Sequence, residues 1–154
     1  RSRSASNGMD QTTILNIYTD GGSRGNPGPA ALGVYIQNQD GTVLARIGKT
    51  IGIATNNIAE YSAIVEGWSW ILSNKEKMTS LRRINFFMDS NLAASQLNGL
   101  YKIKNANLRV LLFSIREKAS EIDSQAYYTH IPREQNKQAD SLVNMALDNK
   151  IILA

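Results

Sequence analysis

Four carboxylates in this chain stand where an apolar run gives way to a turn or a helix. Asp20 closes the run ILNIYT and Asp89 closes the run INFFM. Glu60 lies in the first turn of one predicted helix, and Asp140 lies early in the last one. The chain has no cysteine and a single histidine, His130, so a bound metal ion would depend mainly on oxygen ligands. Carboxylate oxygens suit Mg²⁺ and Mn²⁺, and the four acids together predict a site for such an ion.

Each acid also has an ordinary structural interpretation. Asp20 could form the turn before two glycines, and Asp140 could be a solvated helix residue. Asn57 and Glu60 have the spacing of a capping box, and Asp89 could cap the short helix that follows it. The four taken together favour a functional site, because two of them end the two most apolar strands of the chain.

The stretch GGSRGNPGP follows Asp20 directly. Glycine allows a sharp turn and a close approach of the backbone to a ligand, which a Cβ would obstruct. Asn26 and the two prolines then fix the exit of the turn. This composition predicts a tight turn beside the carboxylates.

Hydrophobic periodicity predicts the elements that must position these acids. Asp40 and Gly41 give a strong hairpin signal between two β runs. The order β-β-β-α-β-α-α-β-α predicts an α/β fold with a mixed five-stranded sheet, three antiparallel strands followed by parallel ones, and helices on both faces. The expected strands lie in residues 14–20, 31–53 (two strands), 82–90 and 126–131, and the expected helices in residues 55–72, 90–99, 107–122 and 136–149.

The strands that end in Asp20 and Asp89 are expected to be parallel neighbours in the middle of the sheet. Their carboxylates would then lie side by side in the crevice beyond the strand ends, where open α/β sheets bind ligands. Two carboxylates that close repel each other unless a proton or a cation intervenes.

Length and composition limit the possibilities further. A chain of 154 residues with 42% hydrophobic content is expected to form one domain, here residues 9–154. Residues 1–8, RSRSASNG, are interpreted as a disordered leader or a cloning remnant, and without their two arginines the net charge of +4 falls to +2. No apolar run is long enough to span a membrane, and the absence of cysteine fits a reducing, cytoplasmic location. The start near Met9 favours a free-standing protein.

Four blocks of the sequence resemble the successive signature blocks of type 1 ribonuclease H: YTDGGSRGNPGPAALGVYI, TNNIAEYSAIVEG, FFMDSNLAASQLNG and PREQNKQADSLVNMA. The resemblance runs from about Ile14 to Ala146, with the blocks in the same order. A single block would be weak, whereas four in order are highly specific. The resemblance implies a ribonuclease H-like fold and a magnesium-dependent endonuclease that cuts the RNA strand of RNA/DNA hybrids, leaving 5′-phosphate and 3′-hydroxyl ends.

The same resemblance assigns roles to individual residues. It implies that two Mg²⁺ ions, which Mn²⁺ could replace, are held about 4 Å apart with Asp20 as the bridge. Amide side chains at the hybrid contacts suit 2′-hydroxyls and base edges, which distinguish RNA from DNA. The catalytic and metal-binding residues would be Asp20, Glu60, Asp89 and Asp140, and the substrate contacts Gly21, Asn26, Asn56 and Asn57, with Thr55 in a DNA-phosphate pocket.

Charge agrees with a nucleic-acid substrate. Without the four acids the chain carries 17 basic and 9 acidic residues, so its surface is more basic than the net charge of the chain suggests. Basic side chains along phosphates give affinity that falls with salt. Lys102, Lys104 and Arg109 are the candidates for such contacts.

The chain departs from the family pattern in two places. Only GLYKIKNAN stands where many bacterial members carry a basic protrusion, and no separate hybrid-binding domain is present in the sequence. We therefore expect weaker binding of the hybrid than in members that have either part. His130 aligns with a mobile-loop histidine of the family but lies in a predicted strand. Arg133 or Glu134 could take its place.

Three alternatives remain open. An integrase-like strand-transfer nuclease would share the architecture, and a non-catalytic nucleic-acid-binding module would share the fold and the basic surface. A nucleotide-binding domain is less favoured, because no G-x-x-x-x-G-K-[ST] stretch is present. The preferred hypothesis is a monomer that acts on RNA/DNA hybrid, with no membrane association and no protein partner.

Overall fold

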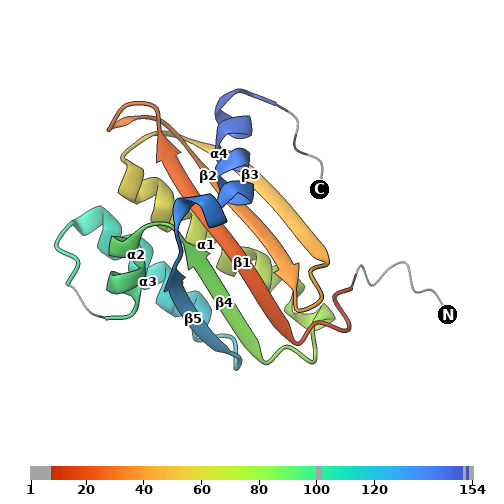
Figure 1. The fold of residues 1–154 in the computed structure, drawn as a ribbon. Coiled ribbons are helices and arrows are strands. Elements are labelled where there is room, and N and C mark those ends of the chain that lie inside the picture. The colour runs from red at the N-terminus through yellow and green to blue at the C-terminus, as the bar shows by residue number, and fades with distance from the viewer. Residues whose placement is uncertain (1–7, 100–101, 151, 153–154) are drawn as a thin grey trace.

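The computed structural model describes residues 8–99, 102–150 and 152. The predicted leader lies outside the described residues except for Gly8. The chain forms one mixed sheet with the strand order β3-β2-β1-β4-β5 (Figure 1). The strands are β1 (Ile14–Ser23), β2 (Gly28–Asn38), β3 (Val43–Ala54), β4 (Arg83–Met88) and β5 (Gln125–His130).

The strand pairing follows the prediction. β1 pairs with β2 and β2 with β3 in antiparallel fashion, and β4 lies parallel to both β1 and β5. Thr19 is the register partner of Met88, so the next residues, Asp20 and Asp89, leave adjacent parallel strands at the same edge. The prediction that the two most apolar strands are parallel neighbours is confirmed.

Helices cover the two faces unequally (Figure 1). α1, α2 and α3 lie behind the sheet in this view, whereas α4 alone crosses its front over β1, β2 and β3. Two short 3₁₀ turns, η2 (Lys75–Lys77) and η3 (Arg133–Gln135), lead into β4 and α4. The helices are α1 (Asn56–Asn74), α2 (Asn91–Leu97), α3 (Ala106–Ala119) and α4 (Lys137–Leu147). None of the described helices is long and apolar enough to cross a bilayer.

An aromatic layer anchors α1 to the back of the sheet. The rings of Trp68 and Phe86 lie 5.4 Å apart and those of Phe86 and Tyr128 5.3 Å apart. The indole Nε1 of Trp68 donates a hydrogen bond of 3.1 Å to the Tyr128 hydroxyl. Large buried rings with a satisfied polar atom give both apolar burial and a fixed geometry, so α1 is held firmly against β1 and β4.

β1 is longer than predicted. It continues past Asp20 to Ser23, which pairs with Ala30, and the turn therefore lies at residues 24–27. A Cβ on Gly21 would overlap the backbone of Ala59. The expectation of a sharp turn at the two glycines is wrong, because Gly21 instead permits the close approach of α1 to β1.

Both predicted caps that involve the acids are wrong. Thr55 is the N-cap of α1, and its Oγ1 accepts a 3.2 Å hydrogen bond from the amide of Ile58. Asn57 lies inside the helix and is exposed, so it does not form a capping box with Glu60. Ser90, not Asp89, caps α2. Glu60 and Asp89 are therefore not needed as caps.

Candidate active site

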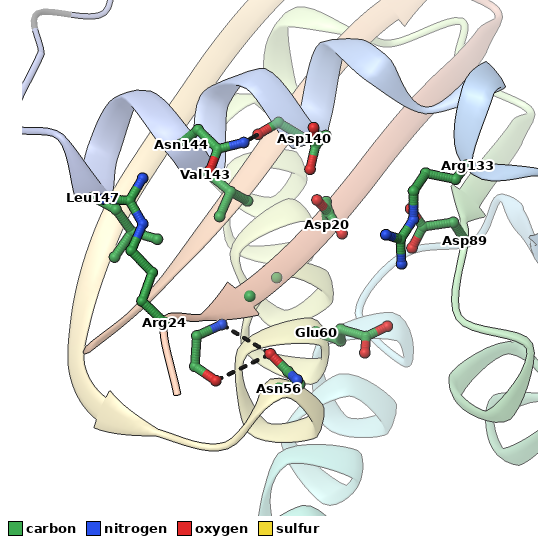
Figure 2. Close-up of a pocket in the computed structure, with 13 residues that line it drawn as sticks. Asp20, Arg24, Asn56, Glu60, Asp89, Arg133, Asp140, Val143, Asn144 and Leu147 are labelled. Carbon is green, nitrogen blue, oxygen red and sulfur yellow. Dashed lines mark hydrogen bonds and ion pairs between the residues drawn. The ribbon is translucent and has the colours of Figure 1, made fainter. Parts of the chain in front are cut away.

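The four acids line one cavity of about 330 Å³ at the carboxyl ends of β1 and β4 (Figure 2). Asp20 comes from β1 and Asp89 from the residue after β4. Glu60 comes from the second turn of α1 and Asp140 from the first turn of α4. Figure 2 shows Asp140 pointing toward the neighbouring Asp20, with Glu60 and Asp89 nearby and with Arg24 and Leu147 on the opposite side.

Two glycines in the sheet bring the helices close enough. Gly21 lets α1 approach the end of β1, as described above. Gly33, the register partner of Asp20, faces α4, and a Cβ there would overlap the carbonyl of Ala139. The side chain of Asn136 is buried and donates a 2.9 Å hydrogen bond to the carbonyl of Thr19, which fixes the start of α4 against β1. Glu60 and Asp140 are thereby held on opposite faces of the strand end.

Burial and mutual repulsion shift the acidity of two carboxyls. Burial, together with the charges of the neighbouring Asp89, Asp140 and Glu60, raises the pKa of Asp20 to about 8. Burial also raises the pKa of Glu60 to about 7, against the lowering effect of a hydrogen bond from Ser90. Carboxyls with raised pKa values in a cleft are typical of functional sites.

Arg133 brings a positive charge to the acids. Its Nε lies 3.9 Å from Oδ2 of Asp89, and its side chain is 85% exposed. The cation also lowers the pKa of Glu60, which opposes the effect of burial there. Arg133 lines the cavity, whereas His130, at the end of β5, and Glu134 do not.

The predicted substrate contacts lie around the start of α1. Asn56 lines the cavity, and its Oδ1 accepts hydrogen bonds of 2.8 and 3.0 Å from the amide and hydroxyl of Ser23. The Oδ1 of Asn26 accepts a 3.0 Å hydrogen bond from the amide of Asn56. Gly21 lines the cavity, whereas Asn26, Asn57 and Thr55 do not. The two asparagine contacts tie the 24–27 turn to α1.

Three polar residues around the cavity were not predicted as site residues. Arg24 lines the cavity and pairs with Asp148 at 2.7 Å. Ser23 also lines it, and Asn144 donates a 3.2 Å hydrogen bond to the carbonyl of Asp140. The spacing of four between Asp140 and Asn144 was the one available sequence signal.

The carboxylates do not form a closed ligand set as they stand. Within the described part of the chain, no three Asp, Glu or His side chains are grouped closely enough to hold an ion. Mg²⁺ in proteins usually keeps several waters and takes one or two carboxylates together with substrate oxygens. An all-oxygen donor set around an open cavity fits that coordination chemistry.

A mixed sheet in the order β3-β2-β1-β4-β5, with four carboxylates at the ends of its central strands, defines the ribonuclease H-like class of nucleases. The sequence model of a family described as "Reverse transcriptase-like" matches residues 18–146. The chain belongs to the type 1 ribonuclease H family.

Individual relatives agree with this assignment. Ribonuclease HI of Halobacterium salinarum is 39% identical over 140 residues, which make up 91% of this chain and 67% of that protein. A bifunctional protein of Mycobacterium tuberculosis is 39% identical over 133 residues, so the chain spans only 35% of its length. The crystal structure of LC11-RNase H1 in complex with RNA/DNA hybrid superposes with a TM-score of 0.82 at 38% identity, covering 88% of this chain and 97% of that one.

Proposed function

We propose that this chain is an endonuclease that hydrolyses the RNA strand of RNA/DNA hybrids and leaves 5′-phosphate and 3′-hydroxyl ends. The observation that carries the proposal is the convergence of four carboxylates, from β1, α1, α4 and the residue after β4, on one cavity of about 330 Å³. Family membership and the hybrid bound by LC11-RNase H1 support the same substrate.

We propose Asp20, Glu60, Asp89 and Asp140 as the residues that hold two Mg²⁺ ions, for which Mn²⁺ can substitute, with Asp20 as the shared ligand. The donor set consists of oxygen alone, which suits these cations. Burial and three acidic neighbours disfavour the charged form of Asp20, and a bound cation would offset both effects. When bound, such ions activate a water molecule and stabilise the charge on the leaving 3′ oxygen.

The polar residues at the start of α1 are proposed to position the hybrid. Asn56 lines the cavity together with the acids and donates its backbone amide to Asn26, and the side chains of Asn26 and Asn57 are exposed. Their amides can donate to and accept from 2′-hydroxyls and base edges. The backbone of Gly21 would contact the RNA strand, and Thr55 would contact a DNA phosphate. Each of these roles is assigned from the resemblance to the type 1 ribonuclease H family.

Arg133 is the favoured auxiliary residue. Its guanidinium faces Asp89 from η3, directly before the helix that carries Asp140. We propose that Arg133 replaces the mobile-loop histidine of other members and acts on the charge of the reacting phosphate. His130 and Glu134 are the weaker candidates, because neither lines the cavity.

Cations on the α2–α3 side are proposed to contact the backbone of the hybrid. Lys102, Arg109 and Arg116 line a second cavity of about 340 Å³, and Lys104 is exposed nearby in sequence. Phosphate contacts of this kind are independent of sequence and weaken as salt rises. Because these few cations stand in place of a basic protrusion, hybrid binding would be weaker than in members that have the protrusion.

We further propose a single domain spanning residues 9–154, a monomeric state and a cytoplasmic location.

Cleavage assays test the proposal directly. Labelled RNA/DNA hybrid, double-stranded RNA and double-stranded DNA are each incubated with Mg²⁺, Mn²⁺ or EDTA. We expect internal cuts in the RNA of the hybrid alone, and none in EDTA. Asp89→Asn should bind the hybrid without cutting it, and the exposed Asp123→Asn should cut normally.

Two results would contradict the proposal. Binding of hybrid without cleavage by the unchanged chain in both metals would favour a non-catalytic module. Joining of DNA ends would favour a strand-transfer nuclease.

A further inference from the structure

The front face of the sheet carries an aromatic surface that the proposed reaction does not use. α4 covers this face over β1, β2 and β3, and the front of β4 and β5 lies beside it (Figure 1). We define the aromatic face by the residues that share this side of the sheet: Asn16, Tyr18, Tyr35, Gln37, Arg46, Arg83, Asn85, Phe87 and Tyr127.

Three of the four rings on this face are linked through Tyr18. Tyr18 and Phe87 are stacked with centroids 5.0 Å apart, and Tyr18 meets Tyr35 edge-on at 6.3 Å. The guanidinium of Arg83 lies 4.0 Å from the ring centre of Tyr127, which is 38% exposed. Aromatic rings and guanidinium planes are surfaces on which planar groups can stack.

A cavity of about 180 Å³ opens beside the aromatic face where it meets α4. Its walls are two rings and three amides: Tyr18 and Tyr35 from the sheet, Gln37 from β2, and Gln135 and Gln138 from η3 and α4. Each amide can donate and accept a hydrogen bond, and each tyrosine hydroxyl can do both. Rings beside amides match a flat heterocycle with a polar edge, which is the shape and chemistry of a nucleobase.

The aromatic face is continuous with the four acids. Tyr18 precedes Asp20 by two residues on the same side of β1, a rise of roughly 7 Å. Phe87 precedes Asp89 by two residues, at the end of β4. The charge is also suitable for nucleic acid: Asp20 is the only acidic residue within the five described strands, and Arg46 and Arg83 project from this face.

We propose that the aromatic face binds unpaired nucleotides, in the form of a single-stranded RNA or DNA extension that leaves the hybrid beside the acids. One base would occupy the cavity between Tyr18 and Gln138. Stacking on aromatic rings tolerates any base, and the amides would contact its edge. This inference rests on the proposed hybrid substrate, because the extension is attached to it.

Binding measurements with four end-extended hybrids test the inference. The cleavage-inactive Asp89→Asn protein is titrated with a blunt hybrid and with hybrids carrying a short extension on the 5′ or 3′ end of the RNA or the DNA. We expect at least one extension to tighten binding by about fivefold or more, as stacking of a base gives on such platforms. The four arms identify which strand and which end the face accepts. The same extension made of abasic units keeps its phosphates but has no bases to stack. It should therefore lose the gain in affinity.

Variants of the cavity rim locate the effect. Gln37→Ala with Gln138→Ala should reduce the gain from the extension while leaving blunt-hybrid binding unchanged. Phe113→Ala is the matched control, because Phe113 is 68% exposed on α3, away from the aromatic face. Thermal unfolding of each variant verifies folding.

The inference is overturned if no extension tightens binding, if the abasic extension binds as well as the normal one, or if the rim variants keep the full gain. Cleavage of the blunt hybrid by the unchanged chain tests the proposed function separately. A protein that cuts the blunt hybrid but ignores every extension would refute this inference alone.

Discussion

Asp20→Asn is expected to make the metal-free protein more stable while abolishing cleavage. Burial and three acidic neighbours raise the pKa of Asp20 from 3.8 to about 8 in the folded protein. A carboxyl whose pKa is raised by folding supports stability fully below its unfolded pKa, and that support is lost as the pH rises through the folded value. The destabilisation by Asp20 therefore grows between about pH 4 and pH 8. Asparagine keeps the shape of the side chain and cannot ionise.

The magnitude has an upper bound from the same pKa values. At pH 7 the difference between 3.8 and about 8 corresponds to at most about 4 kcal/mol. The other three carboxylates still repel one another in the variant, and a buried amide also needs hydrogen bonds. We therefore expect a gain of about 1 to 2 kcal/mol, the usual size for a stabilising change at a functional site. For a protein of this size that gain raises Tm by roughly 2 to 8 °C.

Thermal unfolding in EDTA at pH 5 and pH 8 measures the effect. The gain should be larger at pH 8, and Asp123→Asn, which changes an exposed aspartate, should show no gain at either pH. Saturating Mg²⁺ should stabilise the unchanged protein by about 2.7 kcal/mol at 100 times its Kd, and the variant much less. The reasoning is refuted if Asp20→Asn is no more stable than the unchanged protein in EDTA at pH 8, or if its advantage is greater at pH 5.

Three further predictions follow from the site and its packing. At subsaturating Mg²⁺ the initial cleavage rate should rise from pH 6 to pH 8.5, because cations compete with protons on Asp20 and Glu60, whose pKa values are about 8 and 7; a flat profile would contradict this. Gly21→Ala should lower the free energy of unfolding by about 1 to 3 kcal/mol in urea, because its Cβ would overlap the backbone of α1. Gly22→Ala, whose Cβ would have ordinary contacts, is its control. Arg133→Ala should slow single-turnover cleavage about tenfold, because it removes the positive charge near the reacting phosphate. His130→Ala should keep full turnover. The reverse result would assign the auxiliary role to His130.

The sequence predicted the sheet and the meeting of the acids for a simple geometric reason. Period-two and helical patterns identified the order of strands and helices, and the most apolar strands were expected in the middle of the sheet. Parallel neighbours end at the same edge, so Asp20 and Asp89 had to meet once β1 and β4 were paired. No distance information was needed for that step.

The details that failed depend on contacts between distant segments. Thr55 and Asn57 are both good cap residues, so the local sequence does not determine which of them is used. In the structure Thr55 caps α1, and the helix packs closely on Gly21 of β1. The extension of β1 to Ser23 depends in the same way on pairing with β2. Arg24 escaped prediction because its partner, Asp148, is 124 residues away.

The packing that builds the fold also creates the strained electrostatics of the site. Gly21 admits α1 to one side of β1 and Gly33 admits α4 to the other, and these approaches bury the end of the strand that carries Asp20. A larger side chain at either glycine would push a helix outward, admit water and lower the pKa of Asp20 towards its ordinary value. The raised pKa of Asp20 thus depends on how closely α1 and α4 pack against β1. A substitution that loosens this packing should also lower the pKa. The same substitution should lower the affinity for a divalent cation, because displacement of the helix moves Glu60 or Asp140 away from Asp20.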